Sequence, residues 1–125
     1  MTALFYILLL LFIKHYICDY ILQTERMVAS KGNYGEITGI THSAEHATGT
    51  AIVLLLLLPY DIGAHIVAIV IALMDGVLHY HIDWAKAKLS NGLGVMDKAF
   101  WGWFGLDQLL HTLTYMGIAF LLFLV

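Results

Sequence analysis

The sequence has little of what soluble and secreted domains are built with. Only 12% of its 125 residues are charged, about half the share of a soluble domain, and Pro59 and Cys18 are its only proline and cysteine. One cysteine cannot form an internal disulfide, which excludes a disulfide-stapled secreted domain. The formal net charge of -3 lacks the basic excess of nucleic-acid-binding proteins, so we expect no nucleic-acid partner.

Hydrophobic residues make up 61% of the chain, and the mean hydropathy is +0.83. Four apolar runs are each long enough to cross a bilayer core of about 30 Å. The sequence therefore predicts an all-α, polytopic membrane protein whose partner is the lipid bilayer. We expect one transmembrane domain over residues 1–125, a four-transmembrane-helix bundle with helices over about 3–23, 40–58, 63–88 and 100–124.

Five of the six Lys and Arg residues lie in or beside two of the expected connections. Cytoplasmic loops of membrane proteins carry an excess of Lys and Arg. The loops joining helices one to two and three to four should therefore face the cytoplasm, with both termini on the non-cytoplasmic side, as in an integral protein of the bacterial inner membrane. The residues that set this orientation are Arg26, Lys31, Lys86, Lys88 and Lys98.

Asp75, His79 and Asp83 follow one another at four-residue steps in an otherwise apolar segment. Four residues on a 3.6-residue period drift by only about 40°, so these side chains form one polar stripe. Each of the other expected helices carries a similar pair. These pairs are His15 and Asp19, His42 and His46, and Asp107 and His111.

Alternating helix directions place all of these side chains in the leaflet nearest the cytoplasmic loops. Charged and imidazole side chains cost a few kcal/mol each within a membrane, so such a cluster predicts a functional site. Mixed His and carboxylate ligands suit zinc, iron or manganese. We expect one or two divalent ions, with zinc preferred and iron or manganese as alternatives, while Asp61, His65 and His81 lie outside the site. The candidate ligands are His15, Asp19, His42, His46, Asp75, His79, Asp83, Asp107 and His111.

Metal-dependent hydrolysis of a lipid-borne or amphipathic substrate is the preferred function. Glu45, Asp83 or Asp19 would accept the proton, with Lys14 or Gln108 near the substrate oxygen. Residues 42–46 read H-x-x-E-H, the inverted zincin pattern in which the Glu acts as base. Otherwise Glu45 would provide negative charge near a helix start at which Thr41 is the expected N-cap.

Three alternatives stay open. A chain of weak sites is typical of a divalent-metal or proton transporter, although the outer halves of the last three helices have few polar residues. Haem ligation is a second alternative, with His46 and His79 as axial ligands. The polar pairs are otherwise cross-helix hydrogen bonds worth about 0.6 kcal/mol each. A homo-oligomer also stays open.

Three motifs carry a resemblance to a known family. They are KHxxxDxxLQ from Lys14, DxxxHxxxDW from Asp75 and DQxxH from Asp107. The chain resembles, over nearly its whole length, a family of small bacterial and phage-borne integral membrane proteins classed as a domain of unknown function. This resemblance implies a common membrane fold and no activity. A looser similarity of the site is to seven-helix zinc hydrolases of the ceramidase and progestin-receptor type, whose Ser-x-x-x-His segment this sequence lacks.

Overall fold

The computed structural model describes residues 2–124, which form helices joined by loops and turns and contain no strand. This confirms the all-α expectation. A short helix, α2, occupies the first polar connection, and the first long helix ends in a π-helical segment, η1. The elements are α1 (Thr2–Tyr16), η1 (Ile17–Leu22), α2 (Glu25–Ser30), α3 (Ile37–Leu57), α4 (Ile62–Leu89) and α5 (Lys98–Leu124).

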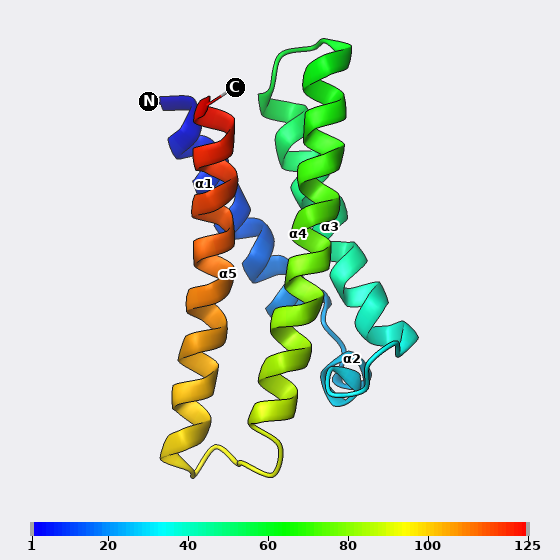
Figure 1. The fold of residues 1–125 in the computed structure, drawn as a ribbon, viewed down its shortest axis with the longest axis vertical. Helices are drawn as coiled ribbons and strands as arrows, with labels where there is room; N and C mark the ends of the chain where they lie inside the picture. Colours follow the sequence, from blue (N-terminus) through cyan, green and yellow to red (C-terminus); the bar gives the residue numbers. More distant parts are fainter. Residues whose placement is uncertain (1, 125) are drawn as a thin grey trace.

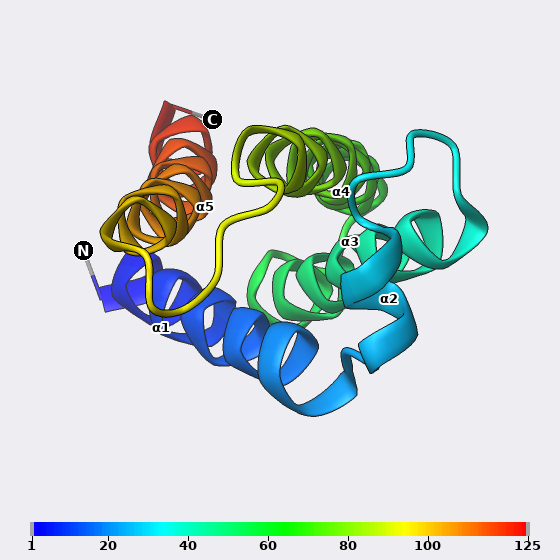
Figure 2. The same ribbon diagram turned by 90° about the horizontal axis from the view of Figure 1, so that it is seen from below.

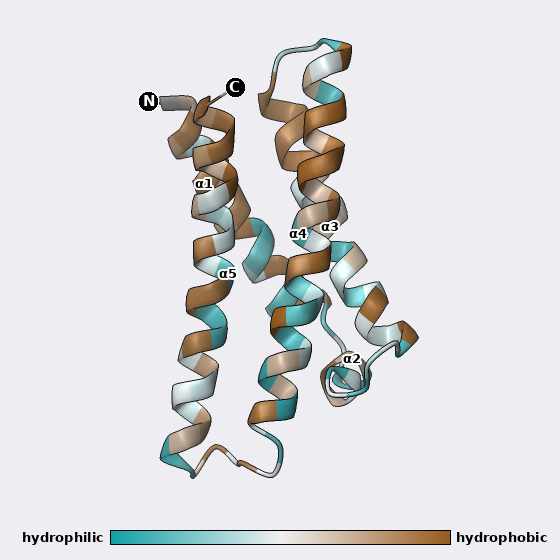
Figure 3. Cartoon of the chain, in the orientation of Figure 1, coloured by the Kyte–Doolittle hydropathy of each residue, from teal (hydrophilic) through white to brown (hydrophobic). Residues whose placement is uncertain are grey.

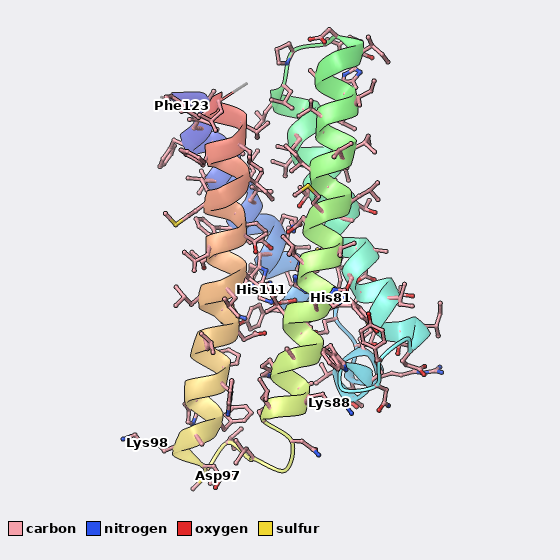
Figure 4. All side chains as sticks on the ribbon, viewed as in Figure 1. His81, Lys88, Asp97, Lys98, His111 and Phe123 are labelled. Atoms are coloured by element: carbon pink, nitrogen blue, oxygen red, sulfur yellow. The ribbon has the colours of Figure 1, made fainter. Side chains whose placement is uncertain are left out.

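The four long helices form a ring (Figures 1 and 2). Helix α1 contacts α3 and α5, and α4 contacts the same two helices. Both termini lie at the same end as the α3–α4 turn, whereas α2 and the α4–α5 loop lie at the other end. We call the latter the loop end. Figure 4 places Lys88, Asp97 and Lys98 there and Phe123 near the termini.

The bundle is divided by polarity along its length (Figure 3). Apolar residues dominate the half near the termini, and hydrophilic residues are concentrated toward the loop end. The apolar core contains side chains from all four long helices, so it closes that half of the bundle. Its buried members are Ile7, Leu11, Val53, Leu54, Ala68, Ile71, Tyr115 and Ile118.

Three segments are long and apolar enough to cross a membrane, namely Ala3–Leu22, Ile62–Leu89 and Lys98–Leu124. Helix α3 is not among them, because its first half is rich in Thr, Ser, His and Glu. It is nevertheless long, with 21 residues, and packs along α4. At their closest approach, Gly76 leaves room for Ala47, since a Cβ at position 76 would lie 2.9 Å from that residue's Cβ.

Two local expectations at helix ends differ from the structure. Helix α3 begins at Ile37 with Glu36 as its N-cap, so the expected cap at Thr41 is wrong. The Thr41 hydroxyl instead donates to the carbonyl of Ile37 within the helix. The first helix is also not α-helical to residue 23, because the wider π-helical turns begin at Ile17. Such turns are frequent at functional sites, and η1 contains the buried Asp19.

Candidate metal centre

Polar side chains from every long helix meet inside the bundle, on the loop-end side of the apolar core. In Figure 4, His111 lies between α5 and α4. These side chains are at most 9% exposed. Their nitrogen and oxygen atoms form three overlapping groups in which all atoms lie within 4.8 Å of one another. The groups are Asp19 with His42, His46 and His79; His15 with His79 and His111; and Asp83 with Asp107 and His111.

Asp19 is the centre of the first group. Its Oδ1 lies 3.0 Å from Nε2 of His42 and 3.0 Å from Nε2 of His46. Nε2 of His79 lies 3.8 Å from the same oxygen and 3.3 Å from Nε2 of His42. Ligands of a tetrahedral zinc ion, with bonds of about 2.0–2.1 Å, lie about 3.3 Å apart. The spacing therefore fits the edges of a metal coordination shell.

Asp83 belongs to the third group and also contacts two histidines of the first. Its Oδ2 lies 3.2 Å from Nε2 of His79 and 3.5 Å from Nε2 of His42. Its Oδ1 lies 3.6 Å from Nε2 of His111. The carboxylate thus presents Oδ2 to His42 and His79 and Oδ1 to His111, so it contacts histidines of all three groups.

The third group contains buried atoms that have no hydrogen-bond partner. His111 Nε2 and Asp107 Oδ1 lie 3.6 Å apart, and neither makes a hydrogen bond. A buried polar atom without a partner costs about 1–3 kcal/mol, so such atoms call for an explanation. A cation between these two donors would satisfy both.

Lys31 provides a positive charge at the loop end of the cluster. This residue caps the C-terminus of α2, and its Nζ lies 2.8 Å from Asp83 Oδ2. Its side chain is 13% exposed, so it lies between the buried carboxylates and the surface. An ammonium here partly neutralises the carboxylate cluster in the structure.

Of the nine ligands expected from the sequence, Asp75 alone belongs to none of the three groups. It is 2% exposed and pairs with Lys14, whose Nζ lies 2.8 Å from its Oδ2. The hydroxyl of Thr50 donates to the same oxygen at 2.6 Å. The structure thus provides Asp75 with a cation and a hydroxyl donor, apart from the ligand groups.

Glu45 lies behind the cluster. Its Oε2 is 3.7 Å from Nδ1 of His42, on the side of the imidazole away from Asp19. Helix α3 begins eight residues earlier, at Ile37, so Glu45 does not cap the helix start. A carboxylate behind a ligating histidine orients the ring and selects its tautomer.

The sequence interpretation missed two members of the site, Thr50 and Tyr115. Each continues a recognised stripe by four residues, since Thr50 follows His46 and Tyr115 follows His111. Tyr115 is 1% exposed and Thr50 is fully buried. The signal was therefore the same helical spacing, carried by a hydroxyl instead of a metal-binding side chain.

The three ionisable residues expected outside the site lie away from the three groups. His81 is exposed, and its Nε2 is 3.1 Å from the hydroxyl of Tyr34. Asp61 accepts a hydrogen bond from the backbone of Ala64 as the N-cap of α4. His65 packs edge-on against the ring of Tyr60 near the α3–α4 turn.

Comparisons with known proteins identify the chain at the level of its family. No curated protein and no solved structure matches it. A family model described as "Protein of unknown function (DUF3307)" matches residues 7–125. This covers nearly the whole chain, including every residue of the three groups, so the chain belongs to that family.

Proposed function

We propose that this protein is a four-span integral membrane protein with a two-ion metal centre near its cytoplasmic leaflet. Helix α3 would be the fourth span, because it packs along α4 inside the ring. The loop end would face the cytoplasm, with both termini on the opposite side. The positive-inside rule supports this orientation, since the basic residues of α2 and the α4–α5 connection are at the loop end.

The single observation that carries the metal proposal is the position of Asp83 between two clusters of imidazole and carboxylate donors. One ion would bind beside Asp19, between His42 and His79. The other would bind between Asp107 and His111, with Asp83 as the bridge. The two clusters are buried, and Asp83 of one cluster contacts histidines of the other, as a carboxylate shared by two metal ions would. Their His and carboxylate donors suit zinc, with iron and manganese as alternatives.

Hydrolysis is the activity that this arrangement supports best. Bound zinc lowers the pKa of a water ligand to about 7 and polarises a carbonyl or phosphoryl oxygen. Asp19 or Asp83 would accept the proton, and Glu45 would hold the ring of His42 in place. Lys31 lies at the loop end of Asp83, where its ammonium would stabilise negative charge that develops on the substrate.

A lipid-borne or amphipathic substrate is favoured by a groove between α1–η1 and α3. The groove has a volume of about 610 Å³, and its walls are mainly aliphatic side chains. Glu45 lies in its lining, one residue from Ala44 and 3.7 Å from the imidazole of His42. Because the groove runs beside the apolar helix α1, we propose that its occupant is an acyl chain whose polar end reaches the metal centre.

Transport fits less well, because the half of the bundle near the termini is closed by apolar side chains. Haem also fits poorly. The imidazoles of His46 and His79 are stacked with centroids 3.5 Å apart, which leaves no room for a porphyrin between them.

The proposal is tested by measuring the metal content of detergent-purified protein that has not been exposed to a chelator. We expect about two equivalents of a transition metal, and strong loss of metal in His79→Ala, with His81→Ala as the matched control on the same helix. Hydrolysis of short- and long-chain p-nitrophenyl esters in micelles tests the activity. Less than half an equivalent of metal in the wild type contradicts the metal centre, and hydrolysis unchanged in Asp83→Asn contradicts the proposed chemistry.

A further inference from the structure

The buried ammonium of Lys14 has three partners. Its Nζ lies 2.8 Å from Asp75 Oδ2 and 3.2 Å from the hydroxyl oxygen of Tyr115. The third partner is Nδ1 of His46, at 3.3 Å. An ammonium has three N–H donors and no acceptor, so Lys14 is the donor in each contact. Asp75 is held in turn by the hydroxyl of Thr50, which fixes the start of the network.

The contact with Lys14 determines which nitrogen of His46 carries hydrogen. A neutral imidazole has one N–H donor and one acceptor nitrogen. Because Nδ1 accepts from Lys14, the hydrogen is on Nε2, which donates to Asp19 Oδ1 at 3.0 Å. The lone pair that would bind a metal is therefore already engaged, and the other nitrogen is a donor to a carboxylate.

A second branch reaches the other oxygen of Asp19. The hydroxyl of Tyr115 accepts from Lys14 and donates its own hydrogen to His15 Nδ1 at 2.9 Å. His15 then carries its hydrogen on Nε2, which lies 3.2 Å from Asp19 Oδ2 and 3.2 Å from Gln108 Oε1. The N–H of His15 is hydrogen-bonded to Gln108, with Asp19 Oδ2 at the same distance, while Asp19 Oδ1 receives the N–H of His46. The tautomers of both histidines are thus set through Lys14.

The same branch continues to a second carboxylate. Gln108 accepts from His15 through Oε1, which directs its amide nitrogen toward Asp107 Oδ2 at 3.1 Å. Asp107 Oδ1 is left free, facing His111. Two carboxylates of the cluster, those of Asp19 and Asp107, are therefore oriented by hydrogen bonds that begin at one lysine.

We infer that Lys14 anchors a directed hydrogen-bond network in which His15 and His46 orient carboxylate ligands and do not themselves bind metal. This inference rests on the proposed metal centre for its functional meaning. It reduces the eight clustered residues to six ligands, which is a better match to two ions sharing a bridging carboxylate. The six are Asp19, His42, His79, Asp83, Asp107 and His111.

Burial makes the direction of the network fixed. Lys14 is 6% exposed, Asp75 2%, and Thr50 and His46 are fully buried. Water cannot replace a missing partner there, and reversing one hydrogen bond would leave buried groups facing each other with two donors or two acceptors. His15 and His46 are accordingly positioning residues, which act on the metal through the carboxylates they hold.

Nitrogen chemical shifts of ¹⁵N-histidine-labelled, metal-free protein in micelles test the network directly. We expect His15 and His46 to be protonated at Nε2. Tyr115→Phe should remove the preference of His15 for the Nε2-protonated tautomer and leave the tautomer of His46 unchanged. Lys14→Met should remove this preference in both histidines. Protonation of His46 at Nδ1 in the wild type would overturn the inference. The same result would follow if His15 had the same tautomer populations in Tyr115→Phe as in the wild type.

Zinc titration of two glutamine variants tests the division into ligands and positioning residues. Glutamine keeps an N–H donor for a carboxylate but is a poor zinc ligand. His46→Gln should keep the wild-type number of zinc ions with affinity reduced about 10–100-fold, the usual effect of losing an outer-shell partner. His79→Gln should lose at least one equivalent.

Loss of the same equivalent in both variants would make His46 a ligand and overturn the inference. The two proposals fail separately. If the wild-type protein binds no zinc, the metal centre is wrong, whereas the tautomers in metal-free protein still decide whether the network exists.

Discussion

Replacing Lys14 with methionine should destabilise the bundle severely, although methionine fits the apolar surroundings of the lysine stem. The carboxylate of Asp75 would lose the ammonium that lies 2.8 Å from its Oδ2, while staying 2% exposed. Breaking a buried ion pair by removing one partner costs about 3–5 kcal/mol, because the remaining charge is uncompensated. Against a total stability of about 5–15 kcal/mol, that is a large fraction.

The companion variants are Asp75→Asn and the double variant Lys14→Met/Asp75→Asn. The double variant has no buried charge at this position, and an asparagine carbonyl can still accept from the hydroxyl of Thr50. It should therefore recover about 2–4 kcal/mol relative to the sum of the two single changes, which is the coupling expected of residues in direct contact.

Reversible unfolding in mixed micelles by sodium dodecyl sulfate, followed by the fluorescence of the three tryptophans, measures these free energies. Additive single-variant effects, with no recovery in the double variant, would refute the assignment of Asp75 as the partner of Lys14. Zinc binding supplies a second readout. Asp75→Asn should keep both ions with weakened affinity, whereas a true ligand would lose an equivalent.

Three further predictions concern the bridge, the access side and the helix packing. Asp83→Asn should reduce zinc from about two equivalents to one or none, as measured by metal analysis, because each oxygen of the carboxylate faces a different cluster. Lys31→Met should tighten zinc binding in a competition titration, since the ammonium at 2.8 Å competes for the carboxylate; weaker binding would contradict this. Gly76→Ala should cost about 1–3 kcal/mol through the forced contact with α3, whereas Gly102→Ala, which points into open space, should unfold like the wild type.

The clustering of the site residues could be predicted from their helical spacing together with the alternating directions of the helices. Residues four apart lie on one helix face, and antiparallel helices bring the stripes to one depth. The structure places His79, Asp83 and His111 within one cluster, although they belong to two helices and are up to 32 positions apart. Burial of several ionisable side chains in an apolar chain leaves few other arrangements, because each must find a partner.

The division of labour within the stripes could not be predicted in the same way. Asp75 and Asp83 are eight residues apart, which is about 12 Å along a helix, so both cannot contact one compact centre. Whether Asp75 or Asp83 joins the groups of possible metal ligands depends on the level along α4 at which Lys14 packs, because Lys14 pairs with the carboxylate at that level. That level is set by the packing of α1 against α3 and α5, which is tertiary information.

The π-helical turns of η1 are also absent from the sequence pattern. The spacing of His15 and Asp19 is that of an ordinary α-helix, and nothing in residues 17–22 breaks it. In the structure the π-helical turns begin at Ile17, two residues before Asp19, where two histidines of α3 approach the same carboxylate oxygen. The geometry of that approach is a property of the assembled bundle and is not encoded in local propensity.

The Lys14–Asp75 pair divides the interior into two parts with different roles. Toward the termini the interior is apolar, and the buried charged and imidazole side chains of the described residues lie from the pair toward the loop end. Lys14 and Thr50 both donate to Asp75 Oδ2, and the hydroxyl of Tyr115 accepts from Lys14, so these contacts end the described polar network beside the apolar core. Among the described residues, the groups of possible metal ligands and Lys31 lie on the other side of the pair, toward the loop end. This asymmetry is expected of a one-sided reaction centre, whereas a transport pathway would need polar groups beyond the pair.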